Sequence, residues 1–279
     1  MKNGDSKNDI EQLDRLFRAV LKSSKYKNVC EDLIKNIGEK ELSKRKNFDE
    51  ALKSTKNKLH QIGGAYFVKR PDYGNWIEAL RSARKTGDKD LFREKCLEVM
   101  SYHHSTKERL NTLDQFYSRI FSMLPKVNSI IDIACGFNPL SIPMMPVSEN
   151  IRYYACDVYR DLIDFINEYF SISSIEGLAE TRDVTQSPPK THADLALVLY
   201  AIPCLEQIDR LAGRKILESV DADFVVVSFP LRSLGVRDKG MRKHYEARFN
   251  TLLKGKDWGT QRLDFGTEMV FIIQKDRVS

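Results

Sequence analysis

The sequence predicts an α/β fold in which a mainly parallel sheet follows a smaller helical domain. Through the first 124 residues, apolar side chains recur every three or four positions, which is the spacing typical of helices. From about residue 126, short β-branched or aromatic runs alternate with helical stretches, which indicates a parallel sheet wrapped by helices. The last two runs are separated by only a few residues, so we expect them to form an antiparallel hairpin.

The helical part is predicted as a succession of amphipathic segments. Residues 9–23 carry one apolar stripe, and residues 29–37 repeat the same spacing. A lysine-rich segment over residues 40–60 has few apolar positions and is broken by Gly63 and Gly64. Further helical patterns occur near residues 75–86, 88–102 and 106–124.

The sheet is predicted from the runs that follow. Parallel strands are expected at residues 129–133, 152–157, 180–184, 194–200 and 223–229, and the hairpin strands at 260–263 and 268–274. Helices near residues 159–171, 204–219 and 240–253 separate them. We place the division at residue 105, so that residues 1–105 form a basic helical domain and residues 106–279 form the sheet domain.

The positive charge of the chain lies in its first third. Residues 1–100 contain 23 Lys and Arg against 16 Asp and Glu, although the whole chain has a net charge of only +6. Residues 51–70 hold five basic side chains and no acidic one, namely Lys53, Lys56, Lys58, Lys69 and Arg70. A basic domain joined to a near-neutral one indicates a polyanionic partner, although a solvated helix face explains the charge alone equally well.

The composition argues against a membrane or secreted protein. There is no run of about 18 apolar residues, so no membrane-spanning helix is expected. The first twelve residues are polar and lack the apolar centre of a signal peptide. The five cysteines are widely spaced and form no CxxC pair, so we expect reduced thiols, no zinc site and a cytoplasmic location.

A turn with little side-chain bulk follows the first predicted strand, in the stretch Asp132–Pro139. Ala134 and Gly136 let a ligand approach the backbone closely there. Asp157 ends the second strand, where a carboxylate suits ribose hydroxyls, and Asp183 follows the third, where it can accept from an adenine amine. Each acid alone is commonly a turn or cap residue. With Asp132, however, the acids put three carboxylates at one sheet edge, and this combination predicts a nucleoside cofactor.

The expected nucleoside is not a dinucleotide. A dinucleotide-binding turn follows the pattern G-x-G-x-x-G, and here positions 134, 136 and 139 are Ala, Gly and Pro. With so little glycine, the backbone cannot wrap a pyrophosphate tightly. S-adenosylmethionine (SAM) has no phosphate and therefore fits this turn better.

Arg109 and the histidines beside it precede the sheet domain. An arginine fork can hold a carboxylate through paired hydrogen bonds, although such a residue taken alone is more often exposed on a helix. His103 and His104 have no third metal ligand at a suitable spacing, so we expect them to cap or pack.

A second basic stretch follows the fifth predicted strand, at the same sheet edge as the acidic residues. Residues 228–245 gather Arg232, Arg237, Lys239, Arg242 and Lys243 beside Met241 and Tyr245. Cations can hold phosphates, and an aromatic or thioether surface can take the face of a base. A basic surface loop explains this composition equally well.

These stretches together resemble one family, the aminoglycoside-resistance 16S rRNA (guanine-N7) methyltransferases, named for guanosine 1405 of the decoding site. The matching pieces follow the family's order and are Leu59–Tyr66, His104–Arg109, Asp132–Pro139, Ser228–Pro230 and Ser233–Met241. The resemblance implies a class I SAM-dependent methyltransferase fold, a Rossmann-like seven-stranded sheet with a small helical N-terminal domain.

The resemblance also implies roles for individual residues. By position it assigns Arg109 to the SAM carboxylate, Asp157 to the ribose and Asp183 to the adenine. We expect the cofactor site to be completed by Ala134, Gly136, Val184 and Tyr200. Arg237, Lys239 and Met241 fall in the stretch that faces the target nucleotide, and RNA binding is assigned to Lys53, Lys56, Lys58, Lys69, Arg70 and Arg232. The family usually has a lysine where this chain has Tyr200.

The implied activity is SAM-dependent methylation of N7 of guanosine 1405 in the 16S rRNA of the small ribosomal subunit, with aminoglycoside resistance as its result. Guanine N7 carries a lone pair and no proton, so we expect no catalytic acid or base and no metal. Alignment of the reactants can supply about 7–11 kcal/mol, and the guanine has to be flipped out. We expect a monomer. Two alternatives stay open: a SAM methyltransferase with another substrate, and a catalytically impaired rRNA-binding relative.

Overall fold

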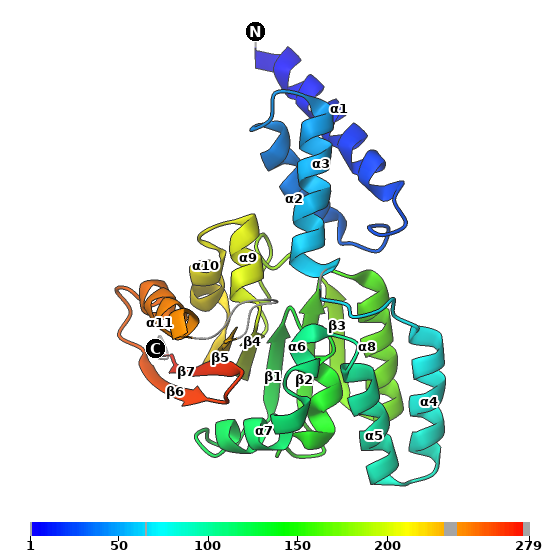
Figure 1. The fold of residues 1–279 in the computed structure, drawn as a ribbon, viewed down its shortest axis with the longest axis vertical. Coiled ribbons are helices and arrows are strands. Elements are labelled where there is room, and N and C mark those ends of the chain that lie inside the picture. The colour runs from blue at the N-terminus through cyan, green and yellow to red at the C-terminus, as the bar shows by residue number, and fades with distance from the viewer. Residues whose placement is uncertain (1, 65, 232–238, 276–279) are drawn as a thin grey trace.

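The protein consists of a seven-stranded sheet covered by helices on both faces, with a helical bundle standing above one end of it (Figure 1). The computed structural model describes residues 2–64, 66–231 and 239–275. The strand order is β3-β2-β1-β4-β5-β7-β6. Strand β7 runs antiparallel to β5 and β6, and the other neighbours are parallel. The predicted parallel sheet with a terminal hairpin is therefore confirmed.

The strands lie close to their predicted positions, with one exception. They are β1 (Ser129–Ile133), β2 (Arg152–Asp157), β3 (Glu176–Thr181), β4 (Ala193–Leu199), β5 (Ala222–Pro230), β6 (Gly259–Asp264) and β7 (Glu268–Gln274). Strand β3 begins before the expected residue 180, because Glu176 is already paired with Arg152 of β2. The carboxylate of Asp183 accepts the N–H of Thr185, and this turn takes the chain out of the ladder.

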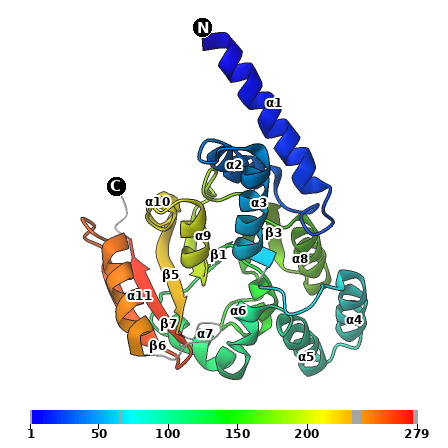
Figure 2. The same ribbon diagram turned by 45° about the horizontal axis from the view of Figure 1, so that its top comes forward.

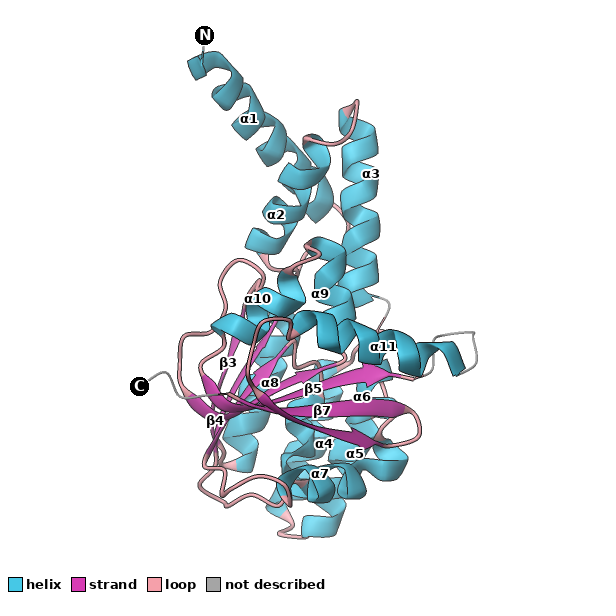
Figure 3. Ribbon diagram, turned by 90° about the vertical axis from the view of Figure 1, so that its left-hand side faces the viewer, coloured by secondary structure: helices cyan, strands magenta, loops and turns pink. Residues whose placement is uncertain are grey.

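Helices cover both faces of the sheet (Figure 3). One face carries α4 (Tyr73–Lys85), α5 (Lys89–Met100), α7 (Leu113–Phe121) and α8 (Arg160–Ser173), and the other carries α9 (Ile202–Ile208), α10 (Ala212–Ser219) and α11 (Lys239–Leu252). The helix expected over residues 204–219 is interrupted at Asp209, whose backbone is extended and whose carboxylate accepts the N–H of Leu211. The helix expected over 106–124 is similarly divided into α6 (His104–Lys107), a 3₁₀ turn and α7.

The two faces of the central strands account for the core. Along β4 and β5, Leu197 and Val226 belong to the apolar cluster under α8, whereas Val198 and Val227 belong to the cluster under α9. All four side chains are completely buried. Parallel strands covered on both sides read as continuous apolar runs, which is why they were recognisable in the sequence.

The helical bundle consists of α1 (Lys2–Leu21), α2 (Glu31–Leu42) and α3 (Phe48–Leu59), and a π turn, η1 (His60–Gly64), leads from it to the sheet. Helix α1 extends away from the rest of the molecule (Figure 2). Helix α3 begins later than residue 40 because Asn47 accepts the N–H of Glu50 and caps its first turn. In the part of the chain that the structure covers, no helix has the length and apolarity needed to cross a membrane.

Helices α4 and α5 lie before residue 105 but pack with the sheet domain. Trp76 and Leu80 of α4 and Phe92 of α5 share the apolar cluster of α8 and the sheet. Helices α4 and α5 therefore pack as part of the sheet domain, and apolar side chains of the bundle join the cluster on the other face of the sheet. The assignment of residues 1–105 as one functional unit stays a prediction.

Candidate functional site

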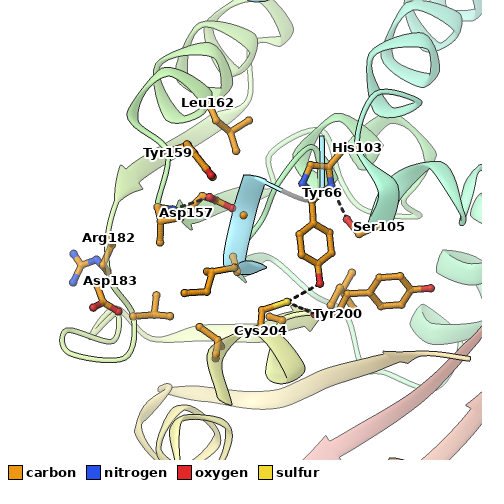
Figure 4. Close-up of a pocket in the computed structure, with 18 of the residues that line it drawn as sticks. Tyr66, His103, Ser105, Asp157, Tyr159, Leu162, Arg182, Asp183, Tyr200 and Cys204 are labelled. Carbon is orange, nitrogen blue, oxygen red and sulfur yellow. Dashed lines mark hydrogen bonds between the residues drawn. The ribbon is translucent and has the colours of Figure 1, made fainter. Parts of the chain in front are cut away.

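A pocket opens at the carboxyl ends of β1, β2 and β4, where η1 of the bundle reaches the sheet (Figure 4). It encloses about 720 Å³ of free space, counting solvent at its mouth. The largest part of the wall is apolar and includes Ile62, Val184, Leu199, Leu205 and Ile208. Asp157 and Asp183 supply carboxylates.

The turn after β1 has the geometry that its small residues indicated. Ala134 and Gly136 both have positive φ, +54° and +51°. The N–H of Gly136 donates to Oδ2 of Asp157 over 3.0 Å. A Cβ at Gly136 would lie 3.0 Å from the imidazole ring of His103, so both the positive φ and this close contact disfavour a side chain at Gly136.

The carboxylate of Asp157, at the end of β2, is fixed by backbone N–H groups and can still accept further hydrogen bonds. Its Oδ2 accepts from Gly136 and its Oδ1 from the N–H of Val158 over 2.7 Å. Burial raises the pKa of this carboxyl, while the backbone donors oppose the shift. A carboxylate has about four acceptor positions, so Asp157 can still accept from a pair of hydroxyl groups.

Asp183 lies at the other end of the pocket from His103 and Tyr66 (Figure 4). Its side chain is 3% exposed. Oδ1 accepts from the N–H and the hydroxyl of Thr185, over 3.0 and 2.7 Å. Oδ2 accepts from the side-chain amide of Asn36 in α2, over 2.8 Å. About one acceptor position remains toward the pocket.

Arg109 is buried behind the pocket rather than on its wall. Its guanidinium forms a bidentate ion pair with Glu268 of β7, with N···O distances of 2.8 and 2.6 Å. Both side chains are at most 2% exposed. Burial opposes the charge of Arg109, but Glu268 outweighs it and the pKa of Arg109 is raised. A cofactor carboxylate would therefore meet an arginine that already has an acidic partner.

Tyr200 lines the pocket between the ligand space and Arg109. Its ring centre is 5.4 Å from the guanidinium carbon of Arg109, and its hydroxyl is 3.4 Å from Glu108. The residue has φ +58°, and its N–H donates to the hydroxyl of Ser228. A tyrosine in this left-handed conformation is strained, and the surrounding contacts hold it.

Among the pocket residues that were not predicted as site residues are Tyr66, His103 and Cys204. The Tyr66 hydroxyl lies 2.7 Å from the Cys204 sulfur, and the Tyr66 ring stacks on His103 at 5.6 Å. Burial lowers the pKa of His103 to about 3, so the ring is neutral at physiological pH. Tyr66 ends one of the stretches that carried the resemblance, but a linear pattern does not show which side chains turn into a pocket.

Asp132 was expected at the ligand edge with the other acids and is not there. It lies within β1, buried, and accepts from Asn138 over 2.9 Å and from the Tyr153 hydroxyl over 2.7 Å. Burial raises the pKa of this carboxyl to about 7. The prediction of three carboxylates at the pocket was therefore wrong for Asp132, because the side chains of a strand alternate between faces.

The seven residues predicted for the cofactor divide into two groups. The pocket is lined by Ala134, Asp157, Asp183, Val184 and Tyr200. Gly136 and Arg109 lie behind the wall and act on it through Asp157 and Tyr200. These positions do not test the predicted ligand contacts, which stay predictions.

The residues predicted to bind RNA also differ from one another. Lys53, Lys69 and Arg70 are exposed and Lys56 is half-buried, whereas Lys58 forms a 2.7 Å ion pair with the buried Glu41. Met241 is half-buried on α11. Arg232 and Arg237 lie outside the described residues, as does the side chain of Lys239.

A possible metal-ligand set lies at the opposite edge of the sheet. Ligand atoms of His192, Asp194 and Asp223 lie within 4.8 Å of one another. Asp194 already accepts the backbone N–H groups of Asn128 and Ser129, which explains its position structurally.

Comparison with known proteins gives a consistent result. A family model described as "Ribosomal RNA methyltransferase (FmrO)" matches residues 22–272. The 16S rRNA (guanine(1405)-N(7))-methyltransferase of Micromonospora rosea is 33% identical over 95% of this chain and 97% of its own length. The protein of the same name from Serratia marcescens is 31% identical over 92% of this chain and 96% of its own.

Solved structures agree with the sequence relatives. The 16S rRNA methyltransferase RmtF, in complex with S-adenosyl-L-homocysteine (SAH), superimposes with a TM-score of 0.80 at 25% identity, covering 95% of this chain and 99% of that one. The 16S rRNA methylase RmtB gives a TM-score of 0.77 at 27% identity, covering 95% and 98%.

Proposed function

This chain belongs to the FmrO family of ribosomal RNA methyltransferases, and we propose that it transfers the methyl group of SAM to N7 of guanosine 1405 in 16S rRNA. The observation that carries this proposal is the pocket at the carboxyl edge of the sheet, with Asp157 and Asp183 on its wall. Relatives that match this chain over nearly their whole length are named for this activity. One related methyltransferase, RmtF, was solved in complex with SAH.

The residues of the pocket fit SAM. Asp157 has free acceptor positions for the ribose diol, and Asp183 has one for the adenine amine. The apolar side chains of Val184, Leu199 and Leu205 can cover the faces of the adenine. SAM supplies a methyl group on a sulfonium centre, and we assign Arg109 to its carboxylate through Nη1, which Glu268 does not contact and which makes a long hydrogen bond of 3.4 Å to Asn138.

No general base is needed, and we propose that His103, Tyr66 and Cys204 do not act as one. The pKa of His103 is lowered to about 3 by burial, and burial raises the pKa values of Tyr66 and Cys204. All three groups are therefore neutral near pH 7. Guanine N7 has no proton to lose, so the task of the protein is to align the base, and such alignment can be worth about 7–11 kcal/mol.

The helical bundle is proposed to dock on ribosomal RNA. Lys53 and Lys56 lie on α3, and the exposed Lys69 and Arg70 follow η1 in the segment that leads to α4. Phosphate contacts of this kind position a protein on RNA. The stretch with Arg232, Arg237, Lys239 and Met241 is proposed to face the target guanine. The protein is proposed to act as a cytoplasmic monomer and to confer aminoglycoside resistance.

The direct test is to incubate purified small subunits with the protein and methyl-labelled SAM, and to map the modified base. We expect one labelled position, guanosine 1405, and growth on gentamicin and kanamycin of cells expressing the chain. Labelling of another substrate without subunits would favour a different methyltransferase. Subunit binding without methyl transfer would favour a non-catalytic relative, for which the strained Tyr200 beside Arg109 would be the first suspect.

A further inference from the structure

The wall of the pocket is held in part by the helical bundle. Asn36 lies on α2, half-buried, and its side-chain amide donates to Asp183 Oδ2 over 2.8 Å and to the Thr185 hydroxyl over 3.2 Å. Asn36 and Asp183 are 147 residues apart in the sequence. A residue of the bundle therefore touches the carboxylate that the proposed function assigns to the adenine.

Asn36 fixes one of the two oxygens of Asp183. Oδ1 of Asp183 accepts hydrogen bonds from Thr185, which belongs to the same turn. Oδ2 accepts its hydrogen bond from Asn36, which belongs to the helical bundle. Without the Asn36 donor, the carboxylate of Asp183 can rotate or turn its Oδ2 lone pairs away from the pocket. A hydrogen bond to a charged acceptor is stronger than a neutral one, so this contact sets the orientation.

We propose that Asn36 is a positioning residue for the cofactor, acting through Asp183 from the helical bundle. This inference rests on the proposed function, because it takes Asp183 to be the contact of the adenine. It adds that the bundle, besides carrying cations for RNA, completes the cofactor site.

A second contact on the same side supports this arrangement. The N–H of Cys30, which precedes α2, donates over 2.7 Å to the carbonyl of Val158, and Asn28 accepts the N–H of Arg160 over 2.8 Å. Val158 is itself a pocket residue next to Asp157. The bundle thus contacts both acidic turns, at the end of the pocket that the proposed function assigns to the nucleoside.

The test measures binding of two ligands by calorimetry: SAH, and 5′-methylthioadenosine, which keeps the nucleoside and lacks the amino acid end. Asn36→Ala is expected to weaken both to a similar degree, on the order of tenfold. Asn36→Asp, which has nearly the same shape, is expected to weaken both more, because it places a second carboxylate against Asp183. Because the two ligands share only the nucleoside, a similar loss for both locates the effect at that end of the pocket.

Asn28→Ala is the matched control. Its side-chain amide bonds Asp161 over 2.7 Å across the same boundary, and Asp161 does not line the pocket. Asn28→Ala should change SAH affinity less than twofold. An equal loss in the two alanine variants, or none in Asn36→Ala, would overturn the inference.

A double-mutant cycle with Asp183→Asn separates this inference from the proposed function. If Asn36 acts through Asp183, Asn36→Ala should cost less than twofold once Asp183 is replaced. A full tenfold loss in that background would contradict the proposed route. If Asp183→Asn alone binds SAH and 5′-methylthioadenosine like the unchanged protein, the assignment of Asp183 to the adenine fails, and the inference fails with it.

Discussion

The cations of this protein occupy two contrasting environments. The side chain of Arg109 is 1% exposed and donates hydrogen bonds to both carboxylate oxygens of Glu268 in β7. On helix α3 of the bundle, Lys53 is exposed, and the described part of the chain shows no ion pair for it or for Lys56. A buried charge has to keep its partner, whereas an exposed lysine is available to a polyanion. A basic side chain therefore stabilises the fold in one region and is proposed to bind RNA in the other.

The largest effect is expected from breaking the buried pair. Glu268→Ala leaves the guanidinium of Arg109 without its counter-charge inside the protein, which should lower the free energy of unfolding by about 3–5 kcal/mol. Urea denaturation followed by circular dichroism measures this change.

The control for this prediction is Glu246→Ala. Glu246 pairs with Arg262 on the surface, where the side chains are 47% and 34% exposed, and Arg262 keeps a second partner in Asp264. The loss should stay below about 1 kcal/mol. Similar losses in the two variants would mean that burial does not distinguish these ion pairs.

The next effect comes from the turn that positions Asp157. Gly136→Ala forces alanine into φ +51° and brings a Cβ to 3.0 Å from His103. The left-handed conformation costs about 1–2 kcal/mol and the overpacking about 1 more, so we expect about 2–3 kcal/mol of destabilisation. SAH affinity should fall as well, because the N–H of Gly136 holds Asp157.

Gly87→Ala isolates the conformational part of that effect. Gly87 has φ +74°, but an added Cβ would meet nothing within 4 Å. It should cost only about 1–2 kcal/mol and leave SAH binding unchanged. Thermal unfolding measures the stability of both variants. An equal loss of stability in the two would show that His103 moves aside for the added methyl group.

How far the sequence predicted these regions depends on the range of the interactions. Local pattern was sufficient for the central strands, because their apolar runs and the Gly136 turn are contiguous in sequence. It failed at β3 and Asp132, where pairing register and strand face decide the outcome. Asn36 and Glu268 were missed for the same reason, since their partners lie more than 140 residues away. No linear pattern reports such contacts.

The sequence also does not distinguish the exposed lysines of the bundle from Lys58, which is paired with Glu41. The exposed lysines give the third prediction. Lys53→Glu with Lys56→Glu should weaken binding to small ribosomal subunits by tenfold or more, with little change in SAH affinity. The slope of log affinity against log salt should become shallower by roughly 1.4–1.8, since each of the two lost phosphate contacts contributes about 0.7–0.9. Filter binding at several salt concentrations measures both quantities.

The matched control reverses two exposed lysines at the far ends of α4 and α5, Lys85→Glu with Lys89→Glu. The net charge changes equally, but these residues lie on the sheet side, away from the bundle. Subunit binding should be nearly unchanged. If both double variants bind equally weakly, total charge rather than the surface of the bundle governs docking.

The smallest effect sharpens the comparison within the bundle itself, at Lys58. Burial of Glu41 would raise its pKa, but the donors of Lys58 and Arg45 outweigh this and lower the pKa to about 2. Because the ordinary pKa is 4.5, the pair stabilises the fold fully above pH 4.5 and loses this contribution as the pH falls toward 2. Lys58 is 24% and Arg45 46% exposed, so solvent reduces the contribution to about 1 kcal/mol. Glu41→Gln should therefore flatten the pH dependence of the free energy of unfolding between about pH 2 and 4.5. If urea titrations show an unchanged slope, the ion pair of Lys58 with Glu41 does not stabilise the fold, and Lys58 resembles the unpaired cations of the bundle.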